Sequence, residues 1–299
     1  MSLIDKGIAL FWLNTKRMDD ERIATLSVPD GVTEVNNLPY LEDGHSYHLL
    51  DAYYPEKAEG KLPVIIDIHG GGWAYGDKEL NKIYCLTLTK KGYVVFNMSY
   101  RLYPEVTAHS QLKDIRDALY WIKTHLSDFP CDENNIYLTG DSAGGMLAAF
   151  TSMLSQSSEV RYIFDIEDTG LRFNAVALTS PVAYMDDKFP MNFYTNIMLG
   201  GKAFRKEKWA SYVNFDRLLP LGRMLPTFLL TSSGDFLARE QTRRCYKDIR
   251  EAGVDAQLMD FASFKGEDLP HVFPILYPES EASQRAINEM LSFFKKYAR

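Results

Sequence analysis

Residues 136–145 read IYLTGDSAGG, and this stretch decides the fold. Its first four residues are apolar or β-branched and predict a buried strand, and a helical pattern starts at Ala143. Residues 140–144 between them match G-x-S-x-G in the strand–turn–helix setting that this motif requires. The glycines on either side leave room for a sharp turn that lifts the Ser142 hydroxyl off the end of the sheet. The stretch therefore predicts a nucleophilic serine, with an ordinary tight turn as the alternative.

Strand-like runs alternate with helical patterns on both sides of this turn. Further apolar runs occupy residues 46–54, 64–68, 93–98, 175–178, 228–231 and 256–259. Helical patterns occupy residues 78–91, 112–122, 143–154, 239–252 and 281–297. Strands that are apolar on both faces and separated by helices predict a parallel sheet covered on both sides. Because ligands lie at the carboxyl ends of such strands, residues that directly follow a strand are the candidates for a site.

Three adjacent glycines follow the run at 64–68, in the sequence HGGGW at 69–73. Glycines at this place let backbone N–H groups turn toward a ligand, as in the loops that stabilise an oxyanion. The expected donors are the backbone amides of Gly71, Gly72 and Ala143. A phosphate-binding loop is the alternative, but no Gly-Lys-Ser/Thr follows and Trp73 would crowd a phosphate. We interpret His69 as a residue that holds the loop by hydrogen bonds.

A serine hydroxyl needs a base to attack at neutral pH. Of the six histidines, His271 alone follows Ser142 in the chain, and enzymes with this turn place nucleophile, acid and base in that order. Asp235 comes shortly after a predicted strand and would fix the tautomer of the histidine and stabilise its protonated form. Asp260 and Glu267 are rivals for the acid, but they lie close to the histidine in sequence.

Two regions break the alternation: residues 1–45, which begin with a predicted helix over 3–20, and residues 183–223. The second region is rich in aromatic side chains, and a structureless loop of that length is improbable, so we expect packed helices there. They form either an extra layer of core or a cap over the strand ends, and the position of the insertion favours the cap. Candidate substrate contacts are Trp73, Tyr103, Phe193 and Trp209.

The composition of the chain limits the classes of protein to which it can belong. The chain has 299 residues, with 33 basic and 40 acidic side chains and a net charge of −7, which argues against a nucleic-acid or anionic-membrane partner. Its three cysteines have no metal-ligand spacing and are interpreted as reduced, buried thiols. The apolar run at 8–13 is too short to span a bilayer. We expect a cytoplasmic protein with no metal, no cofactor and no stable membrane anchor, and a homodimer stays open.

Taken together, the motifs resemble the hormone-sensitive-lipase-like esterases, also called the α/β-hydrolase fold-3 group. They are HGGGW (69–73), YRLYPE (100–105), GDSAGG (140–145), GDFL (234–237) and HVF (271–273), and the resemblance covers residues 48–298. It implies an α/β-hydrolase fold in a single domain, with a mostly parallel central sheet, helices on both faces and a helical cap from residues 1–45 and 183–223. Family members often have Ala where Tyr103 stands here, and Asp114 matches a family aspartate that we interpret as structural.

The resemblance also implies an activity: a serine carboxylesterase acting on short-chain acyl esters without a cofactor. The triad by position is Ser142, Asp235 and His271, and the oxyanion donors are Gly71, Gly72 and Ala143. Three alternatives stay open. The same triad would serve an amidase of the arylformamidase type or a deacetylase of acylated sugars, and a ligand-binding pseudo-hydrolase is an alternative of another class.

Overall fold

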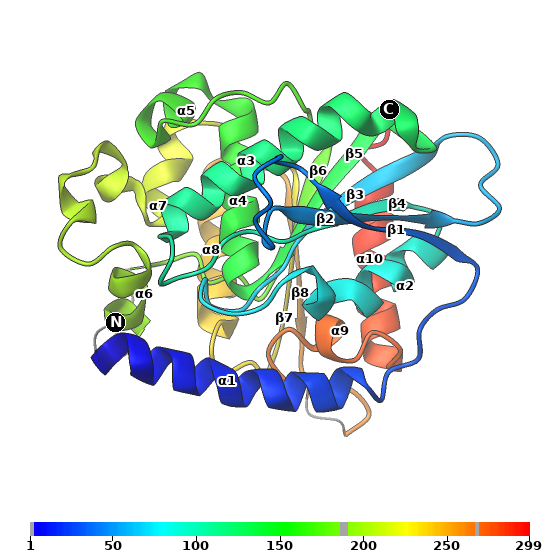
Figure 1. Ribbon diagram of the computed structural model, residues 1–299, viewed down its shortest axis with the longest axis horizontal. Helices are drawn as coiled ribbons and strands as arrows, with labels where there is room; N and C mark the ends of the chain where they lie inside the picture. Colours follow the sequence, from blue (N-terminus) through cyan, green and yellow to red (C-terminus); the bar gives the residue numbers. More distant parts are fainter. Residues whose placement is uncertain (1–2, 186–190, 267–268) are drawn as a thin grey trace.

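The computed structural model describes residues 3–185, 191–266 and 269–299 (Figure 1). Its centre is an eight-stranded sheet in the order β1-β2-β4-β3-β5-β6-β7-β8. The strands are β1 (Val32–Pro39), β2 (Leu49–Pro55), β3 (Leu62–Ile68), β4 (Val94–Met98), β5 (Cys131–Asp141), β6 (Ala175–Thr179), β7 (Thr227–Ser232) and β8 (Ala256–Phe261). In this order, every neighbouring pair from β4 through β3 to β8 is parallel. The β1–β2 and β2–β4 pairs are antiparallel. The predicted α/β-hydrolase fold is thus confirmed.

Helices cover both faces of this sheet, as the two-sided apolar strands require. The helices are α1 (Leu3–Ile23), α2 (Lys82–Lys90), α3 (Ala108–His125), α4 (Ser142–Gln156), α5 (Ser158–Phe164), α6 (Met191–Met198), α7 (Phe215–Leu218), α8 (Arg239–Glu251), α9 (Phe273–Leu276) and α10 (Glu281–Lys295), with short 3-10 turns η1 (Lys78–Asn81), η2 (Leu126–Asp128), η3 (Phe204–Lys206), η4 (Lys208–Tyr212) and η5 (Leu219–Leu221). Side chains of α3, α4 and α8 share one core with Val64 and Ile66 of β3. Those of α2 and α10 share the other core with Ile65. Successive side chains along β3 therefore point to opposite faces of the sheet and pack in two separate cores.

The N-terminal segment divides between cap and sheet. Helix α1 runs along the edge of the molecule from beside α6 toward α9 (Figure 1). Arg22 near its end donates a hydrogen bond to the Leu276 carbonyl of α9 at 2.8 Å. Residues 32–39, which the sequence assigns to the cap segment, instead form edge strand β1. A register shift between Val35 and Leu38, at two asparagines, interrupts the alternation that would have revealed this strand.

The insertion at 183–223 folds into short helical pieces, as its length and aromatic content predict. Helices α6 and α7 and the turns η3, η4 and η5 lie within it, and its residues 186–190 lie outside the described part of the chain. Glu267, a rival for the acid, also lies outside the described part of the chain.

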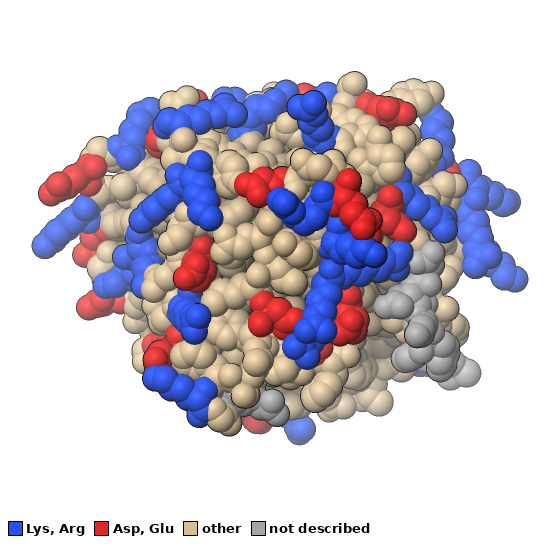
Figure 2. All heavy atoms as spheres, turned by 180° about the vertical axis from the view of Figure 1, so that it is seen from behind, with Lys and Arg blue, Asp and Glu red and all other residues tan. Residues whose placement is uncertain are grey.

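On the face drawn in Figure 2, basic side chains lie among acidic ones rather than in a block of one sign. Among the described helices none is both long and apolar enough to cross a membrane. The cytoplasmic location and the absence of a nucleic-acid partner stay predictions.

Candidate active site

The turn between β5 and α4 holds Ser142 in a strained backbone conformation. Its φ is +52°, a left-handed value that non-glycine residues rarely adopt. The turn also needs glycine at 144, since a Cβ there would lie 2.2 Å from the carbonyl oxygens of Ile68 and His69. The start of α4 thus packs directly on the end of β3. This contact brings the serine next to the glycine loop that follows β3.

Three segments far apart in the chain place Ser142, His271 and Asp235 in one line. His271 Nε2 lies 2.9 Å from Ser142 Oγ, and its Nδ1 lies 2.9 Å from Asp235 Oδ1. If Nδ1 carries the proton and donates to the carboxylate, Nε2 is free to accept the serine proton. Ser142 and Asp235 are buried, whereas the His271 side chain is about a quarter exposed at 24%. The arrangement is that of a nucleophile, a base and an orienting acid.

Asp235 is held as a carboxylate by its surroundings. Burial alone would raise its pKa, but the hydrogen bond and charge of His271, together with hydrogen bonds from Ser180 and the Ala238 amide, outweigh burial, so the pKa of the carboxyl is lowered. The Ala238 amide and the Thr231 hydroxyl also donate to it, at 2.9 and 3.1 Å. The rival Asp260 instead pairs with Arg239 and Arg243 at 3.1 and 2.6 Å. Geometry therefore selects Asp235 over Asp260 as the partner of the histidine.

The glycine loop after β3 turns through left-handed conformations. Gly71 has φ +106° and Gly72 has φ +58°, and the Gly71 carbonyl accepts from the amides of Ala74 and Tyr75 at 3.1 and 3.0 Å. A Cβ on Gly71 would lie 2.0 Å from the Tyr75 carbonyl oxygen. The loop therefore needs glycine here for both conformation and space. The predicted donor Ala143 is buried in the first turn of α4, at the neighbouring helix start.

A buried carboxylate ties the glycine loop to the serine turn. The Gly70 amide donates to Asp141 at 3.0 Å, so the residue before the nucleophile holds the loop. The Asn81 amide nitrogen, at the start of α2, donates to Asp141 at 2.9 Å and to Asp67 at 2.8 Å. Burial raises the pKa of Asp67 to about 8, with the charge of Asp141 adding to it, and burial raises the pKa of Asp141 to about 6. Near neutral pH the pair holds one proton, mainly on Asp67.

This pair gives the protein a pH-dependent stability that we expect Asp67→Asn to change. A carboxyl whose pKa is raised by folding destabilises the folded state progressively as pH rises from its ordinary pKa to its raised one. For Asp67 that window runs from its ordinary value of 3.8 to about 8. The difference between the melting temperatures of Asp67→Asn and the wild type should thus increase in favour of the variant as pH rises from 5 to 9, by on the order of 5 °C. Thermal unfolding at pH 5, 7 and 9 measures this gain, and a constant difference would contradict the raised pKa.

His69 supports the loop and is not placed as a base. Its ring is buried and stacks on Tyr100, with centroids 4.3 Å apart. Its Nδ1 bonds to the Gly70 carbonyl at 2.7 Å, and the Tyr100 hydroxyl donates to the His69 carbonyl at 2.6 Å. Burial lowers its pKa to about 4, so it is neutral at pH 7 and donates from Nδ1.

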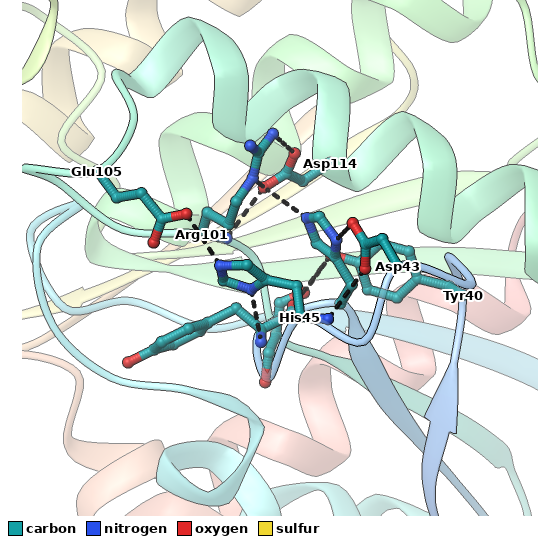
Figure 3. Close-up of polar contacts among 9 residues, drawn as sticks. Tyr40, Asp43, His45, Arg101, Glu105 and Asp114 are labelled. Atoms are coloured by element: carbon teal, nitrogen blue, oxygen red, sulfur yellow. Dashed lines mark hydrogen bonds and ion pairs between the residues drawn. The ribbon is translucent and has the colours of Figure 1, made fainter.

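A polar cluster holds the loop at 100–105 in place (Figure 3). Asp114 accepts from the backbone amide and guanidinium of Arg101, the latter at 2.6 to 2.9 Å. His48 lies between Asp43, at 2.7 Å, and Asp114, at 3.7 Å. His45 bonds to Glu105 of the same loop at 2.9 Å. Asp114 therefore has the structural contacts expected from the sequence, and the loop it anchors in turn holds the Trp73 carbonyl through the Tyr103 amide at 2.9 Å.

The four candidate substrate contacts do not gather at one place. Trp73 is buried under the loop, and the Tyr103 hydroxyl donates to Asp5 of α1 at 2.6 Å. Phe193 is 51% exposed and lines a shallow groove of about 460 Å³ with Asn192, Ile197 and Arg205.

Trp209, the fourth candidate substrate contact, lies in the interior of the cap insertion. It is only 6% exposed and stacks between the rings of His109 and Phe204, with centroid distances of 4.7 and 5.6 Å. It builds the interior of the cap insertion, because a large aromatic ring in short helical pieces is needed to fill their common core.

Sequence reasoning missed two cap residues that contact the glycine loop. A Cβ added to Gly72 would lie 2.5 Å from the Trp12 ring and 2.8 Å from the Tyr194 hydroxyl. Trp12 belongs to α1 and Tyr194 to α6. Both were visible only as aromatic residues within the predicted cap segments, and no spacing rule connects them to the loop.

Comparison with known proteins places this site in a family. A family model described as BD-FAE matches residues 50–198. The fold is shared with an esterase from the bacterial hormone-sensitive lipase (HSL) family, at a TM-score of 0.72 and 21% identity over 94% of this chain and 90% of that one. Esterase B from Lactobacillus Rhamnosis (HN001) is similar over 98% of this chain and 94% of its own, with a TM-score of 0.91 and 30% identity. The chain belongs to the hormone-sensitive-lipase-like esterases. Relatives and structural neighbours of the chain are named as esterases and as a carboxylic ester hydrolase.

Among curated relatives of this esterase family, the chain is similar to the probable isoprenylcysteine alpha-carbonyl methylesterase ICMEL2 of Arabidopsis thaliana. The identity is 24% over 240 residues, which is 76% of this chain and 56% of that protein. The probable carboxylic ester hydrolase LipM of Mycobacterium tuberculosis is 30% identical over 135 residues, 44% of this chain and 31% of that protein. The match thus spans about half the length of the first relative and about a third of the length of the second.

Proposed function

We propose that this esterase hydrolyses short-chain acyl esters through a covalent acyl-enzyme on Ser142, with His271 as base and Asp235 as orienting acid. The observation that carries the proposal is the position of His271, whose two ring nitrogens lie 2.9 Å from the serine oxygen and the carboxylate. The strained turn at Ser142 and the lowered pKa of Asp235 support the same roles.

The first half of the reaction forms the acyl-enzyme. Ser142 Oγ attacks the ester carbonyl carbon while its proton moves to His271 Nε2. The carbonyl oxygen becomes an oxyanion, which the amides of Gly71, Gly72 and Ala143 stabilise. The carbon–oxygen bond to the alcohol then breaks, and the leaving oxygen takes the proton from the histidine.

The second half releases the acid. A water molecule gives a proton to His271 Nε2 and attacks the acyl carbon, so that the same amides again hold an oxyanion. The bond to Ser142 Oγ breaks, and the serine regains its proton from the histidine. Asp235 stays ionised throughout and stabilises the positively charged imidazole in both halves.

Two observations support a preference for short acyl chains. The structural neighbour esterase B, at 31% identity, has been crystallised with a C4-C4 SN3 tributyrin phosphonate as inhibitor. In this chain, Trp12 and Tyr194 close directly over Gly72 of the glycine loop. The two side chains limit the space on the Gly72 side of the oxyanion loop.

The function is tested with p-nitrophenyl acetate, butyrate, octanoate and laurate. We expect kcat/KM to be highest for acetate or butyrate and to fall by at least about tenfold at laurate, because a methylene without space is worth about 1–3 kcal/mol. p-Nitroacetanilide is the matched amide. A higher kcat/KM for laurate would remove the short-chain preference, faster turnover of the anilide would favour an amidase, and no turnover of any substrate would favour a ligand-binding protein.

A further inference from the structure

Two hydrogen bonds in series connect both halves of the cap to the glycine loop. The Trp12 indole N–H of α1 donates to the Tyr194 hydroxyl oxygen at 3.1 Å. The Tyr194 hydroxyl of α6 donates to the Gly72 carbonyl at 2.6 Å. The three residues lie 182 and 122 positions apart in the chain. The two cap segments therefore meet each other at the same point where they meet the loop.

The contact is with the backbone of the loop rather than with a side chain. The Trp12 ring and the Tyr194 hydroxyl occupy the space that a Cβ on Gly72 would need. Burial raises the pKa of the Tyr194 phenol, so its oxygen keeps the proton that it donates to the carbonyl. A neutral donor at 2.6 Å restricts the orientation of the Gly72 carbonyl.

Different parts of the molecule hold the three glycines of the loop. Asp141 holds the Gly70 amide, and the amides of Ala74 and Tyr75 hold the Gly71 carbonyl, all from within the α/β domain. The Gly72 carbonyl is held from the cap. A glycine has two permissive backbone torsions, so this anchor restricts the residue whose own amide is an expected oxyanion donor.

We propose that Tyr194 is a positioning residue that fixes the oxyanion loop, so that seating of the cap and assembly of the oxyanion hole are one event. The inference rests on the proposed function, because it takes the Gly71 and Gly72 amides as oxyanion donors. It assigns the cap a part in stabilising the transition state in addition to covering the substrate. Helix α1 has anchors besides this one, including the bond from Tyr75 to Asp19 at 3.0 Å.

Tyr194→Phe tests this by removing one hydroxyl and keeping the ring. Because the donor amides remain but lose an anchor, we expect kcat for p-nitrophenyl butyrate to fall about tenfold, less than the 10²–10³ seen when a whole donor is lost. KM should stay within about twofold, since an interaction made only in the transition state changes kcat and kcat/KM together. The Ki of butylboronic acid, which forms a tetrahedral adduct with a nucleophilic serine, should rise by the same factor as kcat falls.

Two further variants separate loop positioning from cap attachment. Asp19→Ala removes the hydrogen bond between α1 and the Tyr75 hydroxyl and leaves both bonds of the Trp12–Tyr194–Gly72 series in place, so kcat should stay within about twofold. Trp12→Phe removes the upper bond together with part of the ring that lies over Gly72. It should lower kcat by less than Tyr194→Phe, because the bond to the Gly72 carbonyl remains. Melting temperatures check that all three proteins are folded.

The outcomes separate this inference from the proposed function. A Tyr194→Phe enzyme with wild-type kcat and boronate Ki, or with a raised KM and unchanged kcat, would overturn the positioning role while the esterase mechanism stands. An equal loss in Asp19→Ala would also overturn it, because general loosening of the cap would then be the cause. An inert wild type would instead overturn the proposed function, and with it this inference.

Discussion

Ser142→Ala is expected to lower kcat for p-nitrophenyl butyrate by about 10⁵- to 10⁶-fold. The variant keeps the loop amides and the histidine but has no oxygen to form the acyl-enzyme, so only stabilisation by the site itself remains. The change should leave folding intact, because Ala is smaller than Ser and the strained turn is retained. Initial rates at saturating ester, with equal folded protein by thermal unfolding, measure the loss.

Ser155→Ala is the matched control for this variant. Ser155 lies on the same helix, and its hydroxyl donates to the Ser152 carbonyl at 2.7 Å rather than to any group of the triad. Its activity should stay within about twofold of the wild type. Retention of more than a few per cent of activity in Ser142→Ala would assign the nucleophile to another group.

Asp235→Asn is expected to lower kcat by about 10⁴-fold at pH 7. The amide is nearly isosteric but has no charge to stabilise the protonated His271, and it can present an N–H to the ring and favour the wrong tautomer. KM should change little, since the carboxylate is buried behind the histidine. Steady-state kinetics of the purified variant separate the two constants.

The rival acid supplies the control. Asp260→Asn breaks ion pairs with Arg239 and Arg243, which lie on α8 away from the histidine. Those pairs are partly exposed and worth at most about 1 kcal/mol each, so kcat should stay within about twofold. A large loss of kcat in Asp260→Asn, together with wild-type kcat in Asp235→Asn, would instead assign the role of the orienting acid to Asp260.

The triad could be predicted because two of its members follow predicted strands and the third follows from chain order. Ser142 follows a buried strand in a turn that admits only small neighbours, and Asp235 follows another strand of the same parallel sheet. Parallel strands carry such residues to one edge, so their meeting required no knowledge of side-chain packing. His271 then followed from chain order. The structure gives distances that the sequence could not supply.

The supporting residues could not be predicted, because distance in space decides their roles. Asn81 is an ordinary helix-start residue in the sequence, yet it bridges two carboxylates on different strands. In the sequence, Trp12 and Tyr194 could not be distinguished from the other cap aromatics, and Trp209 was chosen instead as a candidate substrate contact. Ring type does not reveal whether an aromatic side chain fills the interior of a cap or faces a backbone loop. Strand β1 was missed for a related reason, since its bulge removes the alternation.

The cap links specificity to the catalytic loop in this account. Helix α1 has one partly buried face, which includes Asp5, Trp12 and Asp19, and each of these side chains bonds to a tyrosine. These bonds attach the helix by polar contacts rather than by a deep apolar core. A segment attached in this way belongs to the less stable part of a structure and is suited to move when substrate enters.

The central claim is that Ser142 becomes covalently attached to the reacting group. We would treat the wild type and Ser142→Ala with ethyl p-nitrophenyl butylphosphonate and follow p-nitrophenolate release together with peptide mass. Attack of the serine oxygen on phosphorus should expel one p-nitrophenolate per protein and leave the phosphonyl group on the peptide containing Ser142, with no such label in the variant. Labelling of another residue, or ester hydrolysis that persists after full labelling, would contradict the account.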